Sequence, residues 1–268
     1  MEGLTPLLLA FLELTFIMVS LMLLHSLKDT IGNAPFYLCL GMFLVFGQLV
    51  GSAGLQIDTG IDPLQVNMGN AVLLAPYMAA LLIVYIVDGT LAAQRMILGL
   101  LAILFGYFYL AYITASQCLS GGYEAMDPRA VNYIARMFLQ GRRVVAASFI
   151  AQGVDLFILP IVFQLFRNRN CRLFVSVLAT LVLTQVIDTF LFQLIAAPQV
   201  TDWWLALRTT YLARAAAMLW LATLTTIYLH MCNVGETEGR RPLDIVIAFF
   251  GSYGKAQRLQ KHIREWEG

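Results

Sequence analysis

Long apolar runs separated by short polar stretches make up most of the chain. A helix needs about 20 apolar residues to cross the hydrocarbon core of a membrane, and seven of the runs reach or approach that length. The pattern therefore predicts an all-α, polytopic membrane protein with seven transmembrane helices. These lie at roughly 4–24, 35–54, 71–88, 96–116, 144–166, 173–197 and 205–232.

The composition excludes a soluble protein. Hydrophobic residues are 60% of the chain and charged residues 12%, whereas a typical soluble domain has about 25% charged residues. Mean hydropathy is +0.76. The net charge of +1 argues against nucleic acid as a partner, because nucleic-acid-binding domains usually carry a basic face. Membrane lipid is the expected surrounding.

The distribution of basic residues predicts the orientation. Most of the 17 Lys and Arg residues fall in the connections 25–34, 89–95 and 167–172 and in the tail after residue 233, whereas the connection 55–70 has none. Since Lys and Arg are enriched in cytoplasmic loops, we expect the N-terminus outside and the C-terminus in the cytoplasm. The expected location is the bacterial inner membrane.

Two further helices are expected outside the predicted spans. Asp127-Pro128 is a helix-start pattern, and the apolar residues that follow it recur at helical spacing, which predicts a short surface helix within 117–143. Residues 1–234 then form the transmembrane domain, and residues 235–268 form a tail with an amphipathic, basic stripe. That tail fits a helix on the membrane surface. It also fits a connector to a cytoplasmic signalling or energising partner.

Ionisable residues inside the predicted spans are the first candidates for a functional site, because burying charge in hydrocarbon is costly. Glu13, Asp155, Asp188 and Arg214 lie about 14 to 17 Å from the outer ends of their helices, at about 1.5 Å per residue. Asp155 is the deepest of them and has no obvious cationic partner. We expect these four residues to share one layer in the outer half of the membrane.

Amide and phenol side chains lie near the same layer. Gln152 and Asp155 are spaced i, i+3, as are Gln185 and Asp188, so each pair shares one face of its helix. Such groups suit a small polar ligand that has several donors and acceptors. The predicted ligand-binding residues are Glu13, Gln48, Tyr77, Gln152, Asp155, Gln185, Asp188, Tyr211 and Arg214.

A structural role is the alternative for the most conspicuous pair. Asp188 and Arg214 both lie nine positions from the short connection between the last two spans. Neighbouring antiparallel helices would bring them together, and polar pairs often hold transmembrane helices in place. His25 and Asp88, near the cytoplasmic helix ends, are expected to reach water and to play structural roles.

The sequence predicts neither catalytic residues nor a bound cofactor. It lacks a phosphate-binding glycine loop and the H-E-x-x-H pattern. Its three histidines all lie on the predicted cytoplasmic side, so we expect no metal site. None of the lysines falls inside a predicted span, which excludes a retinal Schiff base. We expect a protein that is not an enzyme.

Two segments carry a family resemblance. They are residues 146–152 (AASFIAQ) and residues 180–190 (TLVLTQVIDTF). Together they resemble the vitamin-uptake-type family that includes bacterial queuosine-precursor transporters, which are similar in architecture to the substrate-binding components of energy-coupling-factor importers. The resemblance covers roughly residues 35–232. It implies a six-helix core with one added N-terminal helix, and a small heteroaromatic ligand.

The chain departs from the family pattern at two positions. The acid that the family has after Pro76 is absent, and Asp155 falls about one turn early. The leading expectation is binding and uptake of a small polar heteroaromatic molecule from the outer side. A ligand-sensing membrane domain that signals through its C-terminal helix is the alternative, and a purely structural protein is a third reading.

Overall fold

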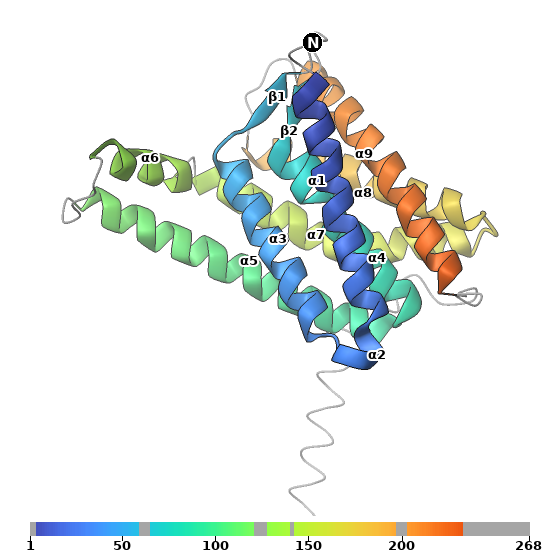
Figure 1. Cartoon of the computed structure of the whole chain (residues 1–268). Helices are drawn as coiled ribbons and strands as arrows, with labels where there is room; N and C mark the ends of the chain where they lie inside the picture. The colour runs from blue at the N-terminus through green and yellow to red at the C-terminus, as the bar shows by residue number, and fades with distance from the viewer. Residues whose placement is uncertain (1–3, 59–64, 121–127, 140–141, 197–202, 233–268) are drawn as a thin grey trace, which may run out of the picture.

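The computed structural model describes the chain except for residues 1–3, 59–64, 121–127, 140–141, 197–202 and 233–268. Helices dominate the described part (Figure 1). They are α1 Leu4–Ser26, α2 Lys28–Ile31, α3 Ala34–Ser52, the π-helix η1 Met68–Leu73, α4 Ala75–Val87, α5 Thr90–Leu119, α6 Pro128–Leu139, α7 Arg142–Arg167, α8 Leu173–Ala196 and α9 Trp203–Met231.

Within the described residues, five helices are long and apolar enough to span a membrane, so the chain is a multi-pass membrane protein. They are Thr5–Ser26, Ala34–Ser52, Thr90–Leu119, Ala147–Arg167 and Leu173–Ile195. The other two predicted spans correspond to α4, which has only 13 residues, and to α9, which has 29. The all-α class is confirmed, and the count of seven spans stays a prediction. The predicted C-terminal amphipathic helix lies outside the described residues.

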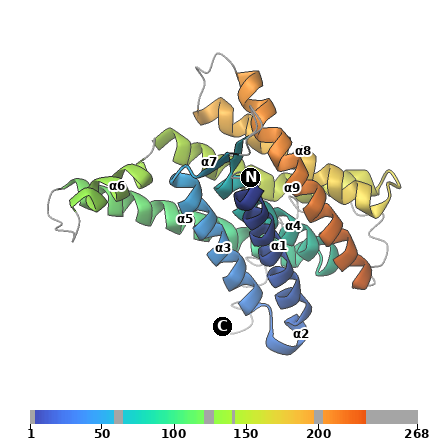
Figure 2. The same ribbon diagram turned by 45° about the horizontal axis from the view of Figure 1, so that its top comes forward.

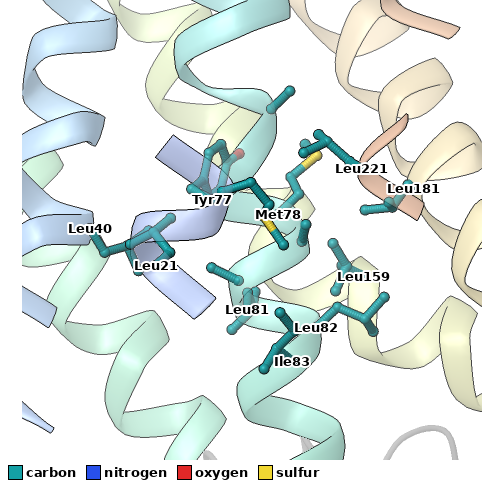
Figure 3. Close-up of a cluster of buried hydrophobic side chains, with 14 of the residues drawn as sticks. Leu21, Leu40, Tyr77, Met78, Leu81, Leu82, Ile83, Leu159, Leu181 and Leu221 are labelled. Atoms are coloured by element: carbon teal, nitrogen blue, oxygen red, sulfur yellow. The ribbon is translucent and has the colours of Figure 1, made fainter. Parts of the chain in front are cut away.

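Helix α4 forms the centre of the molecule. Every residue from Ala75 to Ile86 is buried, as expected for a helix that is apolar on all faces. Helices α1, α5, α7 and α9 pack around α4. Figure 3 shows its side chains, among them Leu81 and Leu82, surrounded by leucines of the neighbouring helices. This enclosure explains how a helix too short to cross a bilayer by itself is accommodated.

The connection 55–70 contains secondary structure that the hydropathy pattern did not predict. Strands β1 Gln56–Asp58 and β2 Gln65–Asn67 pair in antiparallel register, with Ile57 opposite Val66. Their polar–apolar–polar alternation is the period of a strand, and Ile57 is buried. The π-helix η1 follows β2 directly and packs against α3.

The predicted surface helix is confirmed as α6, which begins at Pro128. It packs against α5, and the two helices extend to one side of the bundle (Figures 1 and 2). Ala135 is buried, whereas Tyr133 and Arg136 are exposed. Ile134, which belongs to the same apolar spacing, is also exposed, so the spacing identified the packed face of this helix only in part.

Two glycines allow η1 to approach α3. A Cβ atom built on Gly69 would lie 2.5 Å from the Cα atom of Gly51, a backbone atom that cannot turn aside. We expect Gly69→Ala to lower the free energy of unfolding by about 1 to 3 kcal/mol, the usual cost of overpacking. Thermal unfolding in detergent micelles measures this. The matched control is Gly99→Ala in α5, where a new Cβ meets no atom within 4 Å. Equal melting temperatures for the two variants would contradict the close approach.

Candidate functional site

The last two helices carry a hydrogen-bonded group around a buried guanidinium. Arg214 of α9 donates from Nη1 to Asp188 Oδ2 over 3.1 Å and to Thr189 Oγ1 over 2.9 Å. Gln185 donates from Nε2 to the same Asp188 oxygen over 2.9 Å. Arg214 is only 5% exposed. The i, i+3 spacing puts Gln185 and Asp188 on one face of α8. The packing of α8 against α9 brings that face to Arg214.

Helix α7 adds a second carboxyl group to this region. Helices α7 and α8 pack along each other, and Asp155, 1% exposed, lies close enough to Asp188 and Arg214 for electrostatic interaction with both. Asp155 therefore does not lie in a separate, deeper layer as expected, although within the described residues Arg214 makes its direct ion pair with Asp188 and not with Asp155. Helical depth counts ignore tilt, and the packing of α7 on α8 places Asp155 at the level of the Arg214 pair. Gln152 is buried one turn away.

Tyr77 adds a phenol from the central helix. Its side chain is buried near the N-terminal end of α4, and its hydroxyl lies within electrostatic range of Asp155, Asp188 and Arg214. Pro76 occupies the first turn of α4, a position that tolerates proline because no helical N–H bond is lost there. The phenol therefore reaches the α7–α8–α9 group from α4, as a fourth helix.

We name this set the acid–arginine cluster. Its members come from four different helices and are Tyr77, Gln152, Asp155, Gln185, Asp188, Thr189 and Arg214. Several of its polar atoms are sealed from solvent and, within the described part of the chain, have no hydrogen-bond partner: Tyr77 OH, Gln152 Oε1 and Arg214 Nε. Each such atom costs about 1 to 3 kcal/mol. The carboxyl oxygens of Asp155 receive no N–H group and face the carboxyl group of Asp188. This arrangement is typical of a binding site.

Two of the predicted site residues, Glu13 and Gln48, are not brought into this cluster. Glu13 is partly exposed on α1, and Gln48 is buried on α3 with its amide nitrogen unpartnered. Among the described contacts, none links either residue to Asp188 or Arg214. The side chain of Tyr211 lies outside the described residues. Thr189 was missed as a site residue, although it directly follows Asp188 in the segment that carries the resemblance.

A second group of polar side chains lies near the C-terminal ends of α1 and α9, away from the acid–arginine cluster. The His25 ring makes hydrogen bonds to Tyr228 OH over 2.7 Å at Nδ1 and to Asp88 Oδ2 over 3.1 Å at Nε2. Lys28 pairs with the other oxygen of Asp88. Because a carboxylate only accepts, Nε2 of a neutral ring donates and Nδ1 accepts from the tyrosine.

We name His25, Lys28, Asp88 and Tyr228 the histidine latch. It joins α1, α2, α9 and the residue that follows α4. His25 is 1% exposed, and its ring packs edge-to-face with the rings of Phe36 and Tyr228. The expectation that His25 reaches water is therefore wrong, because the end of α9 covers it.

A family model described as "Vitamin uptake-like sensor" matches residues 18–229, which is most of the chain. The chain belongs to this family. The resemblance to a vitamin-uptake-type family is thereby confirmed. No curated protein and no solved structure matches.

The matched range of this vitamin uptake-like sensor protein contains both polar groups. All members of the acid–arginine cluster and of the histidine latch fall between residues 18 and 229, whereas Glu13 lies outside that range. The two groups thus belong to the part of the chain that the family model describes. Helix α9 contributes a side chain to both groups, and α4 carries Tyr77 of the cluster and is followed directly by Asp88 of the latch.

Proposed function

We propose that the chain is a ligand-sensing membrane domain that binds a small polar molecule in the acid–arginine cluster. The family description supports sensing. The observation that carries the proposal is that α9 holds Arg214 in the cluster and Tyr228 in the latch. These residues are 14 positions apart, about 21 Å along a helix. A ligand that repositions Arg214 would therefore move the other end of α9.

Contacts along α9 support this coupling. Trp220, between the two groups, donates from Nε1 to Thr15 Oγ1 of α1 over 3.0 Å and packs on Phe11. Helix α9 is thus bonded to α8 at one level and to α1 at two. The segment 233–268 follows α9 directly. A signal carried by α9 would pass to that segment and to a cytoplasmic partner or domain.

The proposed topology puts the ligand site toward the outside. With the N-terminus outside and the C-terminus cytoplasmic, as the basic residues indicate, the acid–arginine cluster lies in the outer half of a bacterial inner membrane. The histidine latch then lies at the cytoplasmic end. In this proposal the chain is neither an enzyme nor a nucleic-acid binder. It interacts with membrane lipid, with the small-molecule ligand and with a cytoplasmic signalling or energising protein.

Uptake of the same molecule is the second candidate function, and the vitamin-uptake-type architecture favours it. Transport requires the bound ligand to reach the other side, whereas sensing requires only a change in α9. Proteoliposomes loaded with the purified chain distinguish the two. Accumulation of ligand inside the vesicles would support uptake, and saturable binding without accumulation would support sensing.

A thermal-shift screen of the purified full chain with small polar molecules tests the site itself. A ligand present at 100 times its Kd stabilises the folded state by about 2.7 kcal/mol, so true ligands should raise the melting temperature of the wild type. Asp155→Asn should fold and lose that shift. Thr225→Val on α9, a buried residue outside the cluster, is the control and should keep it. Equal shifts in all three proteins would place the ligand elsewhere.

A further inference from the structure

The unpartnered atoms of the acid–arginine cluster are mostly acceptors. Both carboxyl oxygens of Asp155 and the amide oxygen of Gln152 are buried without a donor other than a proton shared between Asp155 and Asp188, and the Tyr77 hydroxyl can accept as well as donate. Asp188 is already bonded to Gln185 and Arg214. A molecule that fills this site therefore has to bring N–H or O–H donors, and Asp155 offers them two adjacent oxygens.

The charges of the cluster also select the ligand. Two carboxyl groups face one guanidinium, so the ionised cluster carries one unbalanced negative charge. Arg214 already neutralises Asp188 through a direct ion pair. The second carboxyl group, Asp155, is close enough to Asp188 to hydrogen-bond with it when one of the two holds a proton, so the empty cluster avoids the unbalanced charge by keeping that proton. A buried carboxylate without a counter-charge is costly, and a cationic ligand supplies the counter-charge that lets Asp155 ionise.

The shape of a carboxylate narrows the class of cationic ligand further. Its two oxygens accept two parallel N–H groups from a planar amidinium or guanidinium in a paired arrangement, which an ammonium cannot reproduce. A divalent metal ion is disfavoured because the positive charge of Arg214 already acts on the same carboxyl group. On the basis of the proposed sensing function, we infer that the ligand is a cation with paired N–H donors, an amidinium or a guanidinium group, which docks on Asp155 of this cluster.

Four probes of nearly equal size test this inference: benzamidinium, benzylammonium, benzamide and benzoate. Binding to the full chain in detergent micelles is measured by ligand-observed NMR, with micelles lacking protein as the blank. Benzamidinium should bind the wild type at least about tenfold more tightly than benzamide, since charge-assisted paired hydrogen bonds are roughly twice as strong as neutral ones. Benzylammonium should be intermediate, and benzoate should not bind.

Substitutions in the cluster test whether benzamidinium binds at Asp155. Asp155→Asn should weaken benzamidinium at least about tenfold by removing the charge, and Gln152→Met, which retains the carboxylates, should weaken it a few-fold. Asp29→Asn is the matched acid-to-amide control, because Asp29 is exposed on α2, and it should bind as the wild type does. The Gln152 variant decides the matter if the Asp155 variant fails to fold.

Other outcomes separate the ligand class from the proposed function. If benzamide or benzoate bound as tightly as benzamidinium, and the Asp155 and Gln152 variants weakened that binding, the sensing site would stand and the cationic class would be wrong. If a neutral or anionic ligand from the thermal-shift screen bound through Asp155, the sensing site would likewise stand and the cationic class would be wrong. Binding of benzamidinium that neither variant weakens would overturn the assignment to Asp155. A chain that binds no probe and no screened compound would overturn both proposals.

Discussion

Arg214→Ala should lower the free energy of unfolding by about 3 to 5 kcal/mol, the usual cost of removing one partner of a buried ion pair. It would leave Asp155 and Asp188 facing each other without a cation. Asp188→Ala should cost less, because Asp155 remains beside Arg214 as a second counter-charge. Both losses can be read from thermal or denaturant unfolding of the purified protein in micelles.

The double variant tests whether the two residues interact. Asp188→Ala/Arg214→Ala removes both charges of the pair, so its loss should be smaller than the sum of the single losses by at least about 1 kcal/mol, within the range of measured couplings between contacting residues. Strictly additive losses would show that the ion pair at 3.1 Å contributes no coupling to stability. Asp155→Asn should leave stability unchanged or raise it, because it replaces a buried carboxyl group that has no counter-charge of its own with a neutral amide of similar size.

The Asp188–Arg214 pair could be predicted because its geometry is local. Both residues are nine positions from one short connection, and two antiparallel helices joined by a short connection have to be neighbours. The ion pair is confirmed. The shared faces of Gln185 and Asp188 follow in the same way from helical spacing, and the hydrogen bond between them forms as that spacing allows.

The rest of the cluster depends on how distant helices pack, which one sequence does not determine. Tyr77 enters from the central helix α4, which is separated from α7 by the whole of α5 and α6. Asp155 seemed one layer too deep because a depth count assumes that all helices run parallel to the membrane normal, whereas real helices tilt. Glu13 satisfied the same count and is nevertheless partly exposed on α1.

The third predicted span shows a related limit of hydropathy. The apolar run 71–88 has the length of a spanning helix, but the structure divides it between the end of η1 and the 13-residue α4. Hydropathy reports burial, and burial inside protein cannot be distinguished from burial in lipid by composition. The glycine contact between Gly51 and Gly69, which fixes η1 against α3, is likewise a tertiary feature.

His25 was expected to reach water and to play a structural role, and substituting this buried residue should have a large effect at the other end of the molecule. His25→Ala removes a buried ring, its two hydrogen bonds and its contacts with Phe36 and Tyr228. Large-to-small substitutions in cores cost about 2 to 5 kcal/mol, and we expect a loss of about 3 to 5 kcal/mol because Asp88 and Tyr228 also lose a partner. Thermal unfolding measures the loss.

The control for this variant lies on the same helix. His230→Ala changes an exposed histidine two residues after Tyr228 and should leave the melting temperature nearly unchanged. Tyr228→Phe keeps the ring and removes only the hydroxyl that bonds His25, so its cost should be smaller, about 1 to 3 kcal/mol for the unpaired ring nitrogen. Equal stabilities for the two histidine variants would show that the latch does not hold α9.

Tyr228→Phe also tests whether the latch and the ligand site are coupled. Coupling between two sites is reciprocal, so if ligand binding at Arg214 moves α9 against the latch, releasing the latch has to change ligand affinity. We expect Tyr228→Phe to alter the affinity for a ligand of the acid–arginine cluster by about 5- to 150-fold, the usual range for such coupling, although residue 228 lies about 21 Å along α9 from Arg214. An unchanged affinity, measured beside His230→Ala, would mean that α9 does not transmit occupancy of the site and that the signal leaves the bundle through another helix.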